Sequence, residues 1–201
     1  MMTETAPDLN QRIAARVRML RTELGMSLES LASRASVSRS MISLIERGES
    51  SPTAVVLEKL AAGLGVTLAA LFDPPSAAAA EGPPRPVSRR DEQPEWQDPD
   101  SGYRRRNVSP PDVPQPVQIV DVHFPPGARV AIDIGLRDIR VSQQVWILDG
   151  AMDVTVGTDH HRLQAGDCLA MQLDRPTVFH NPTRKAARYA VVLLTESTRR
   201  R

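Results

Sequence analysis

The stretch that most restricts the fold of this chain is residues 73–86, DPPSAAAAEGPPRP, which holds prolines and small side chains but no large apolar residue. Such a segment has too little apolar surface to join a hydrophobic core. Its prolines also oppose helix and sheet interiors. It therefore predicts a mobile tether between two domains, at 1–72 and 87–201, and a chain of 201 residues is long enough for two small cores.

The first domain has the periodicity of helices. Apolar residues recur every three or four positions between Leu9 and Phe72, which is the spacing of one helix face. Hydroxyl side chains that can cap a helix start, and glycines that can end a helix, divide this stretch. The predicted caps are Ser27, Ser38 and Thr53, and the predicted ends are Gly25, Gly48 and Gly63. We expect five short helices, near 9–24, 27–34, 38–46, 53–63 and 67–72.

The second domain shows strand patterns instead. Short runs rich in β-branched residues alternate with turn sequences such as PPG, DG and AGD. The runs are VQIVDVHF, RVAIDI, RVSQQVWIL, AMDVTV, CLAMQL and RYAVVLL. Many short strands at regular spacing are typical of a sandwich or barrel. The fold class is therefore predicted as α+β in two domains, a five-helix bundle followed by an all-β barrel.

Charge and cysteine content exclude some partners and compartments. The chain has 25 Lys plus Arg against 24 Asp plus Glu, a formal charge of +1, so any contact with nucleic acid must come from local arginines. The single Cys168 cannot form an intrachain disulfide, and the start MMTETAPDLNQ lacks the apolar run of a signal peptide. No run approaches the roughly 20 apolar residues of a membrane span. We expect a cytoplasmic protein associated with the nucleoid.

Two of the expected helices have the layout of a helix-turn-helix. SLESLASRA is followed by a tight turn through Ser36 and then by SRSMISLIERG. The inward positions would be Ala32, Val37, Ile42 and Ile45. With these residues the chain resembles the lambda-repressor and Cro-like (XRE) family over about residues 9–72. The resemblance implies a DNA-binding domain, against the alternative of an ordinary helical bundle.

The resemblance also implies which residues contact DNA. It assigns base edges to Arg39, Ser40 and Leu44. Arginine carries the most information, because its fork fits O6 and N7 of guanine in the major groove. The phosphate backbone would be held by a second set, which offers hydroxyl or guanidinium donors. That set is Ser27, Ser38, Ser43, Arg47, Ser50, Ser51 and Thr53.

Three features of the helical domain depart from the family or leave alternatives open. Leu28 stands where the family usually has a phosphate-binding Gln, so that contact is lost or moves to Ser27. Ser36 stands where Gly is favoured, and a left-handed backbone there would cost about 1 kcal/mol. Arg21 and Glu46 occupy positions that the family often joins as an ion pair, but two solvated charges are an equal alternative.

The second domain resembles the cupin family over about residues 87–197, through WILDG, LQAGD and DRPTVFHN. A metal-binding cupin would place His, His, Glu and His where this chain has Arg137, Ile139, Gln143 and Thr177. These side chains are poor ligands for a transition metal. We therefore expect no metal and no cofactor. His160 and His161 are expected in an exposed loop, His180 and Cys168 as packed residues.

A barrel without metal suits a small organic ligand. We expect Arg137, Gln143 and Thr177 to supply polar contacts and Val145 and Ile147 to supply apolar ones. A buried Arg137 would favour a carboxylate. The alternative is that Arg137 is a solvated edge residue and the barrel only dimerises. Trp146 has the opposite strand parity, which favours a dimer interface.

Together these features predict a homodimeric, sequence-specific transcription regulator, not an enzyme. It would bind a near-palindromic operator in double-stranded DNA and respond to a small-molecule effector. One alternative is an architectural or antitoxin-like DNA-binding protein whose barrel only dimerises. Another is a cupin enzyme with a DNA-binding appendage, which the missing ligand set opposes.

Overall fold

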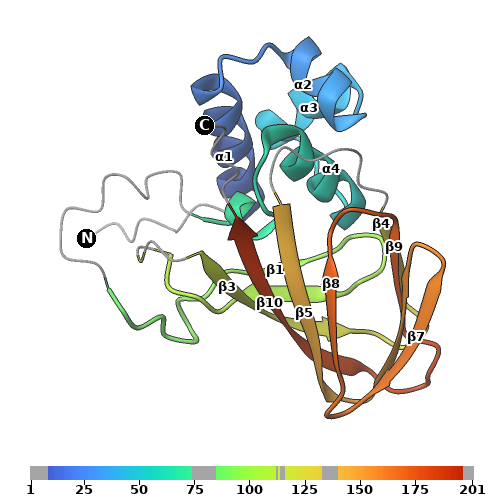
Figure 1. Ribbon diagram of the computed structural model, residues 1–201. Coiled ribbons are helices and arrows are strands. Elements are labelled where there is room, and N and C mark those ends of the chain that lie inside the picture. Colours follow the sequence, from blue (N-terminus) through green and yellow to red (C-terminus); the bar gives the residue numbers. More distant parts are fainter. Residues whose placement is uncertain (1–8, 74–84, 112, 114–115, 133–139, 197–201) are drawn as a thin grey trace.

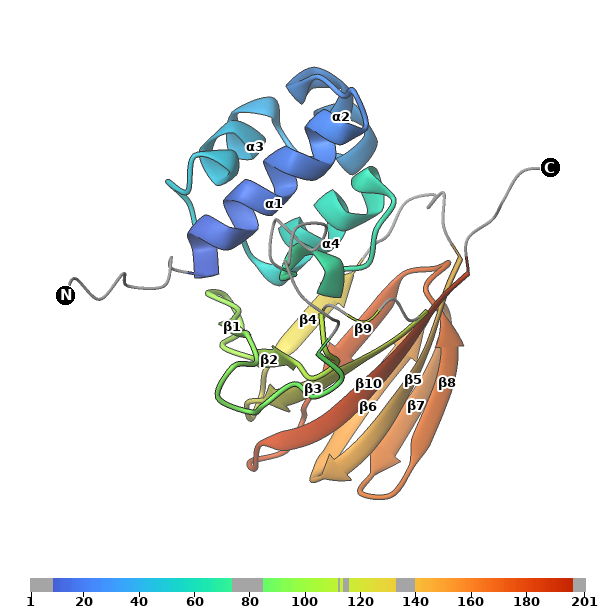
Figure 2. The same cartoon turned by 90° about the vertical axis from the view of Figure 1, so that its left-hand side faces the viewer.

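A helical layer rests on a barrel of two antiparallel sheets (Figure 1, Figure 2). The computed structural model describes residues 9–73, 85–111, 113, 116–132 and 140–196. The tether predicted over 73–86 lies mostly outside the described residues.

Four α-helices form the first layer: α1 (Leu9–Glu23), α2 (Leu28–Ala35), α3 (Arg39–Glu46) and α4 (Ala54–Leu64). The predicted hydroxyl caps are confirmed at three of them. Ser27 accepts a hydrogen bond from the amide of Ser30, and Ser38 from that of Met41. Thr53 caps α4 in the same way. Each cap satisfies one amide that has no partner inside its helix.

The helix ends follow the predicted glycines in two cases of three. Gly25 and Gly48 have positive φ, which glycine adopts without strain. Gly63, however, lies inside α4, which ends only at Gly65 with φ 70°. A methyl group on Gly63 would lie 2.9 Å from Cβ of Ala35. The glycine is therefore needed for the close crossing of α2 and α4, and its assignment as a helix end was wrong.

The fifth predicted helix is a single 3₁₀ turn, η1 (Ala69–Leu71). Its bonds join each amide to the carbonyl three residues earlier, as in Phe72 N to Ala69 O at 3.1 Å. Two prolines follow at positions 74 and 75, and a proline disfavours helical backbone in the residue before it. The segment therefore lacks the length for an α-helix.

An ion pair joins α1 to α3. Arg21 donates to both carboxylate oxygens of Glu46, at 2.6 and 2.9 Å, and also to the carbonyl of Met26 at 2.7 Å. The two side chains are only 14% and 8% exposed. Hydrogen bonding to Glu46 raises the pKa of Arg21. The structure thus favours the ion pair over two solvated charges. Ser36 has the predicted left-handed backbone, with φ 51°.

The ten strands of the described residues form two sheets. The six-stranded sheet has the order β1-β2-β3-β10-β5-β8 and the four-stranded sheet the order β4-β9-β6-β7. All pairs are antiparallel. The strands are β1 (Glu95–Gln97), β2 (Arg104–Asn107), β3 (Val117–Phe124), β4 (Arg129–Ile132), β5 (Arg140–Asp149), β6 (Ala151–Val156), β7 (Asp159–Gln164), β8 (Cys168–Gln172), β9 (Thr177–His180) and β10 (Ala187–Glu196).

The six runs predicted as strands form β3, β4, β5, β6, β8 and β10. Of the other four strands, β1, β2 and β7 are rich in charged or polar residues and lack a clear apolar alternation. The fourth, β9, has only four residues. His160 and His161 lie on β7 and not in a loop, so that expectation was wrong. Cys168, expected to be packed, is exposed at the start of β8.

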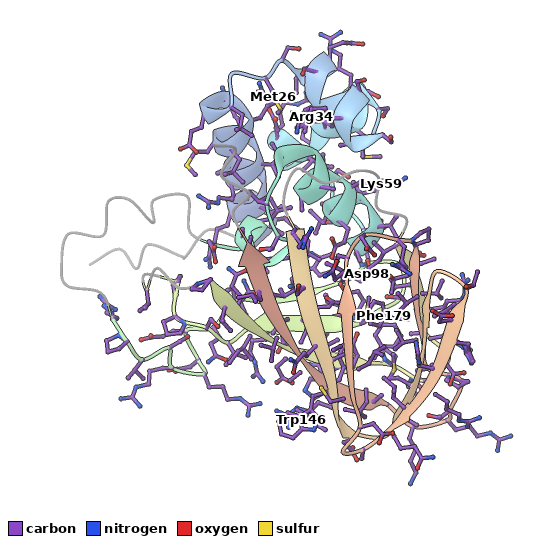
Figure 3. The ribbon with its side chains drawn as sticks, in the orientation of Figure 1. Met26, Arg34, Lys59, Asp98, Trp146 and Phe179 are labelled. Carbon is purple, nitrogen blue, oxygen red and sulfur yellow. The ribbon has the colours of Figure 1, made fainter. Side chains whose placement is uncertain are left out.

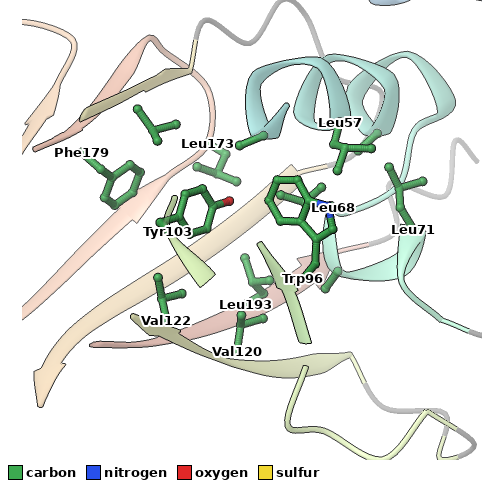
Figure 4. Close-up of a cluster of buried hydrophobic side chains, with 14 of the residues drawn as sticks. Leu57, Leu68, Leu71, Trp96, Tyr103, Val120, Val122, Leu173, Phe179 and Leu193 are labelled. Carbon is green, nitrogen blue, oxygen red and sulfur yellow. The ribbon is translucent and has the colours of Figure 1, made fainter. Parts of the chain in front are cut away.

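A row of aromatic rings joins the helical layer to the barrel interior. Figure 4 shows three of its members, Trp96, Tyr103 and Phe179. Each ring centroid lies between 5.6 and 6.2 Å from the next. The order is Phe72, Trp96, Tyr103, Phe124, Tyr189 and Phe179. Aromatic pairs at this separation stabilise beyond the area they bury. The two layers therefore share one continuous hydrophobic core.

Polar contacts fix the same junction, which we call the seam. Each of them joins a residue that follows α3 to a residue of the six-stranded sheet or its loops. The hydrogen bonds run from Ala54 N to Asp98 Oδ1 at 2.8 Å, from Thr67 Oγ1 to Gln118 Oε1 at 2.8 Å, and from Asn107 Nδ2 to Ala69 O at 2.9 Å. Asp98 thereby satisfies an amide in the first turn of α4 from the barrel side.

Candidate functional site

Helix α3 lies on the side of the helical layer away from the sheets, with α4 between them (Figure 1, Figure 2). Ile42 and Ile45 are buried and anchor the helix. Arg39 and Ser40 are exposed in its first turn, and Leu44 is half-buried. The hydrophobic anchor therefore leaves the predicted base-contacting positions facing outward or at the edge of that face.

Arg39 has its guanidinium available for another partner. Its Nε lies 3.9 Å from Oε2 of Glu29, and the two side chains are 68% and 80% exposed. An ion pair of this length and exposure contributes little stability. A guanine edge could therefore replace Glu29 at small cost.

Arg47 is engaged more firmly. Its Nε and Nη2 donate to the two carboxylate oxygens of Glu49 at 2.9 and 2.8 Å, and its Nη1 donates to Ser43 Oγ. The hydrogen bonds between Arg47 and Glu49 raise the pKa of Arg47 and lower the pKa of Glu49. A phosphate at Arg47 would have to share the guanidinium with Glu49 or displace that carboxylate.

The predicted phosphate-binding hydroxyls gather at helix starts. Ser27, Ser38 and Thr53 use oxygen lone pairs as caps, so their O–H groups remain able to donate to a phosphate. Ser51 accepts from Asn10 at 3.0 Å, and Ser50 lies 3.9 Å from the sulfur of Met41. Helix N-termini attract anions through their free amides and dipoles. The arrangement is thus chemically suited to a phosphate backbone.

A second candidate site is a cavity of about 70 Å³ at the seam. Most of its wall is apolar and comes from both sheets, while Glu58, Thr67 and Leu68 belong to the helical layer. The full lining is Glu58, Thr67, Leu68, Tyr103, Arg105, Val120, Val122, Phe124, Val130, Ile132, Val141, Gln143, Leu173, Phe179, Tyr189, Val191 and Leu193. The helical layer therefore closes one side of the barrel cavity.

The predicted ligand residues are only partly brought together here. Gln143 is buried and lines the cavity. Val145, Ile147 and Thr177 are also buried but lie outside this lining, and the hydroxyl of Thr177 donates to the carbonyl of Arg175 at 3.2 Å. Arg137 lies outside the described residues.

Arg105 on β2 is a cavity residue that sequence reasoning missed. Its side chain is buried, and its Cζ lies 5.0 Å from the ring centroid of Phe72. Its buried Nε has no hydrogen-bond partner among the described residues. The sequence signal was weak, since RRRN reads as a solvated charge run. A period of two through Tyr103, Arg105 and Asn107 would have pointed to one buried face.

Two buried tyrosines lie near this arginine. Burial raises the pKa of Tyr103 to about 12, against the opposing effect of Arg105. Burial also raises the pKa of Tyr189. Both phenols therefore stay neutral at physiological pH, and the cavity wall combines neutral hydroxyls with a guanidinium.

No cluster of three or more His, Cys, Asp or Glu side chains suited to a metal occurs in the part of the chain that the structure describes. Gln143 and Thr177, at two of the ligand positions expected for a metal-binding cupin, are neutral side chains that fit a metal poorly. Within the same residues, no helix is long and apolar enough to cross a membrane.

Comparisons with known proteins identify the helical layer and the fold. The helix-turn-helix family HTH_3 matches residues 17–71. The chain is 28% identical over 176 residues to the HTH-type transcriptional regulator SutR of Escherichia coli (strain K12), covering 87% of this chain and 89% of that protein. It is 39% identical over 66 residues to control protein C.MunI of a Mycoplasma species, covering 32% and 89%.

A solved structure shares the arrangement of both layers. The crystal structure of an HTH_3 family transcriptional regulator from Vibrio cholerae matches with a TM-score of 0.72 at 24% identity, covering 92% of this chain and 96% of that chain. At this identity the likeness shows the fold alone.

Proposed function

Because the chain belongs to the XRE-type (HTH_3) family of DNA-binding helix-turn-helix regulators, we propose that it is a sequence-specific transcription regulator. We propose further that its C-terminal barrel of two antiparallel sheets is a cupin that senses a small molecule. We also propose that the protein is cytoplasmic and associated with the nucleoid.

The outward face of α3 is the observation that carries the DNA-reading role. Arg39 and Ser40 stand exposed in the first turn of a helix whose other face is anchored by buried isoleucines. In a helix-turn-helix the start of the second helix meets base edges in the major groove. We assign base contacts to Arg39, Ser40 and Leu44. Phosphate contacts are assigned to Ser27, Ser38, Ser43, Arg47, Ser50, Ser51 and Thr53.

The sensing role is supported by the cavity at the seam. An apolar cavity with a few polar groups is the usual form of a small-molecule site. Its wall includes Glu58 on α4 and Thr67 and Leu68 beyond it, so an occupant would touch the DNA-reading layer as well as the barrel. We therefore propose that the effector acts by changing how α4 packs on the barrel. Arg137 and Thr177 remain proposed contacts beside Gln143.

A homodimer is supported by an apolar surface on the outer face of the six-stranded sheet. Val117, Ile119, Trp146 and Leu194 are between 37% and 50% exposed. Along β10, Leu194 pairs with Val117, Val192 with Ile119 and Ala190 with Trp146. Because Ala190, Val192 and Leu194 are two residues apart on one strand, all four exposed residues lie on the same face. Figure 3 shows Trp146 at the end of the barrel away from the helices. We define these four residues as the outer patch.

We propose no catalytic role, because the regulator relatives and the poor fit of Gln143 and Thr177 to a metal favour binding over turnover. An architectural protein whose barrel only dimerises is the competing function, and the two differ in ligand response. Thermal unfolding across a metabolite panel separates them, because only a ligand of the native state raises the melting temperature.

Selection of bound sequences from random double-stranded DNA tests the reading role. The full chain should enrich a two-fold related motif. If no sequence were enriched, the protein would bind DNA without sequence preference. That result would contradict the proposed sequence-specific reading.

A further inference from the structure

The seam cavity contains one buried cation whose hydrogen-bonding capacity is not fully used. Arg105 is 7% exposed, faces inward from the middle of β2 and lines the cavity beside Val122. Its buried Nε has no partner among the described residues. A buried donor without a partner is costly, and a charged one more so. An anion in the cavity would remove that cost.

Size and polarity narrow the class of anion. A cavity of about 70 Å³ is roughly half the volume of a ~150 Å³ cavity that admits benzene, which suggests an occupant of about three to five non-hydrogen atoms. The surrounding wall of Val, Leu, Ile and Phe side chains suits a short aliphatic chain. The planar fork of arginine matches the two oxygens of a carboxylate.

The same cavity touches the DNA-reading layer through two features. Arg105 lies against the ring of Phe72, directly after η1. The acidic side chain of Glu58 on α4 forms another part of the wall. A carboxylate that engages Arg105 would draw the guanidinium toward itself and would face Glu58 with like charge. Both effects change how α4 and η1 pack on the barrel.

We propose that Arg105 anchors a short aliphatic carboxylate in the seam cavity, and that the bound acid alters operator affinity through the wall formed by α4 and Phe72. This inference rests on the proposed sensing function and names its ligand class and its anchoring residue.

Propionate and its neutral isostere propionamide test the inference on the full chain, with sodium chloride at matched ionic strength. Titration calorimetry should detect propionate and should find propionamide at least tenfold weaker. Octanoate, which is too long for the cavity, should not compete. Equal affinity for acid and amide, or no binding of propionate, would overturn the proposal without any variant.

Two neighbouring arginines provide matched variants. Arg105→Gln should reduce propionate affinity at least tenfold, whereas Arg104→Gln should leave it unchanged, because Arg104 is exposed and paired with Glu95 at 3.2 Å on the outside. Arg105→Lys keeps the charge without the fork and should bind with intermediate affinity. Parent-like propionate binding by Arg105→Gln would exclude Arg105 as the anchor.

Operator affinity measured in the same samples separates this inference from the function on which it rests. Propionate should change the operator affinity of the parent protein and not that of Arg105→Gln. Specific DNA binding that no carboxylate alters would reject the carboxylate site but not the proposed regulator function. Absence of specific DNA binding by the parent protein would reject the regulator function itself.

Discussion

Arg39 is the residue at which the proposed DNA-reading role of α3 is most easily tested. Replacing Arg39 with Ala should cost about 1 to 3 kcal/mol of operator binding and relax base preference at one position. Its first-turn position and its weak contact with Glu29 leave it free for a base edge. Arg47→Ala, the matched control, should weaken all sequences alike. A base-preference profile measured on a complete set of single-base operator variants checks both, and an unchanged profile for Arg39→Ala would contradict the assignment.

Asp121 should control the acid stability of the barrel. It accepts hydrogen bonds from Arg106 and, at 2.9 and 3.2 Å, from Arg188. Burial raises the pKa of Asp121, but the bonds from Arg188 and Arg106 outweigh it, so the folded-state pKa is lowered. Its stabilisation is therefore full above the unfolded pKa, near ~3.9, and is lost as pH falls through the folded value.

The corresponding variant is Asp121→Asn. At neutral pH it should lower the free energy of unfolding by roughly 3 to 5 kcal/mol, because it leaves Arg106 buried without a counter-charge. Urea unfolding at several pH values measures the difference between parent and variant. Glu95→Gln, in an exposed pair with Arg104, is the control and should have little effect. A difference that grew as pH fell below about 4 would contradict a lowered folded-state pKa of Asp121.

At the residue scale, the sequence predicted features that depend on the local backbone, but it did not predict which charged side chains are buried. The caps Ser27 and Ser38 depend on nearby backbone, so the sequence around them was sufficient to predict them. The left-handed backbone of Ser36 was indicated only by the resemblance to a family that favours Gly there. Arg105 was not predicted, because its burial depends mainly on Phe72 and on barrel strands far along the chain. Within the run of three arginines, only the spacing of two residues from Tyr103 indicates which one turns inward.

At the element scale, the crossing of α2 and α4 makes a specific demand on Gly63. Gly63→Ala should destabilise the fold by about 1 to 3 kcal/mol through overpacking, although alanine is the better helix former by ~1 kcal/mol. The new methyl group would meet Cβ, Cα and N of Ala35 at 2.9 to 3.1 Å. Thermal unfolding measures the loss.

A double variant provides the control for this crossing. Adding Ala35→Gly removes the closest atom and should recover part of the stability lost in Gly63→Ala. A fully additive cycle would show that the two residues do not meet across the crossing.

Elements with clear periodicity were predicted, and those formed by tertiary context were not. The helix-turn-helix and the long strands β3, β5 and β10 follow from their own side-chain patterns. Strands β1 and β2 carry no such pattern and exist because they extend the sheet from β3. The helix predicted near 67–72 is only the single turn η1. Two prolines follow it in the sequence, and Phe72 packs against Trp96 directly after it.

At the scale of the whole molecule, the outer patch should hold two copies together. Trp146→Lys places a charge at its most exposed residue, which is 50% exposed, and should shift sedimentation from dimer to monomer. Val87→Lys is the matched control, since Val87 is as exposed at 53% but lies outside the patch. A parent protein that sediments as a monomer both with and without DNA would contradict the dimer.

The two layers form one unit, because the seam joins them through a shared core and a shared cavity. The sequence predicted two separate cores, since the segment between them holds no large apolar residue. It could not predict that Phe72, Trp96 and Tyr103 would join those cores across it.

The most direct test of DNA reading by α3 is guanine-N7 methylation interference on a selected operator bound by the full chain. We predict interference at two major-groove segments about 10 base pairs apart, the spacing that a helix-turn-helix dimer imposes on B-DNA. Arg39→Ala should remove the interference at one guanine in each segment. Absence of interference at guanine N7, or a pattern unchanged by Arg39→Ala, would contradict the reading of DNA by α3.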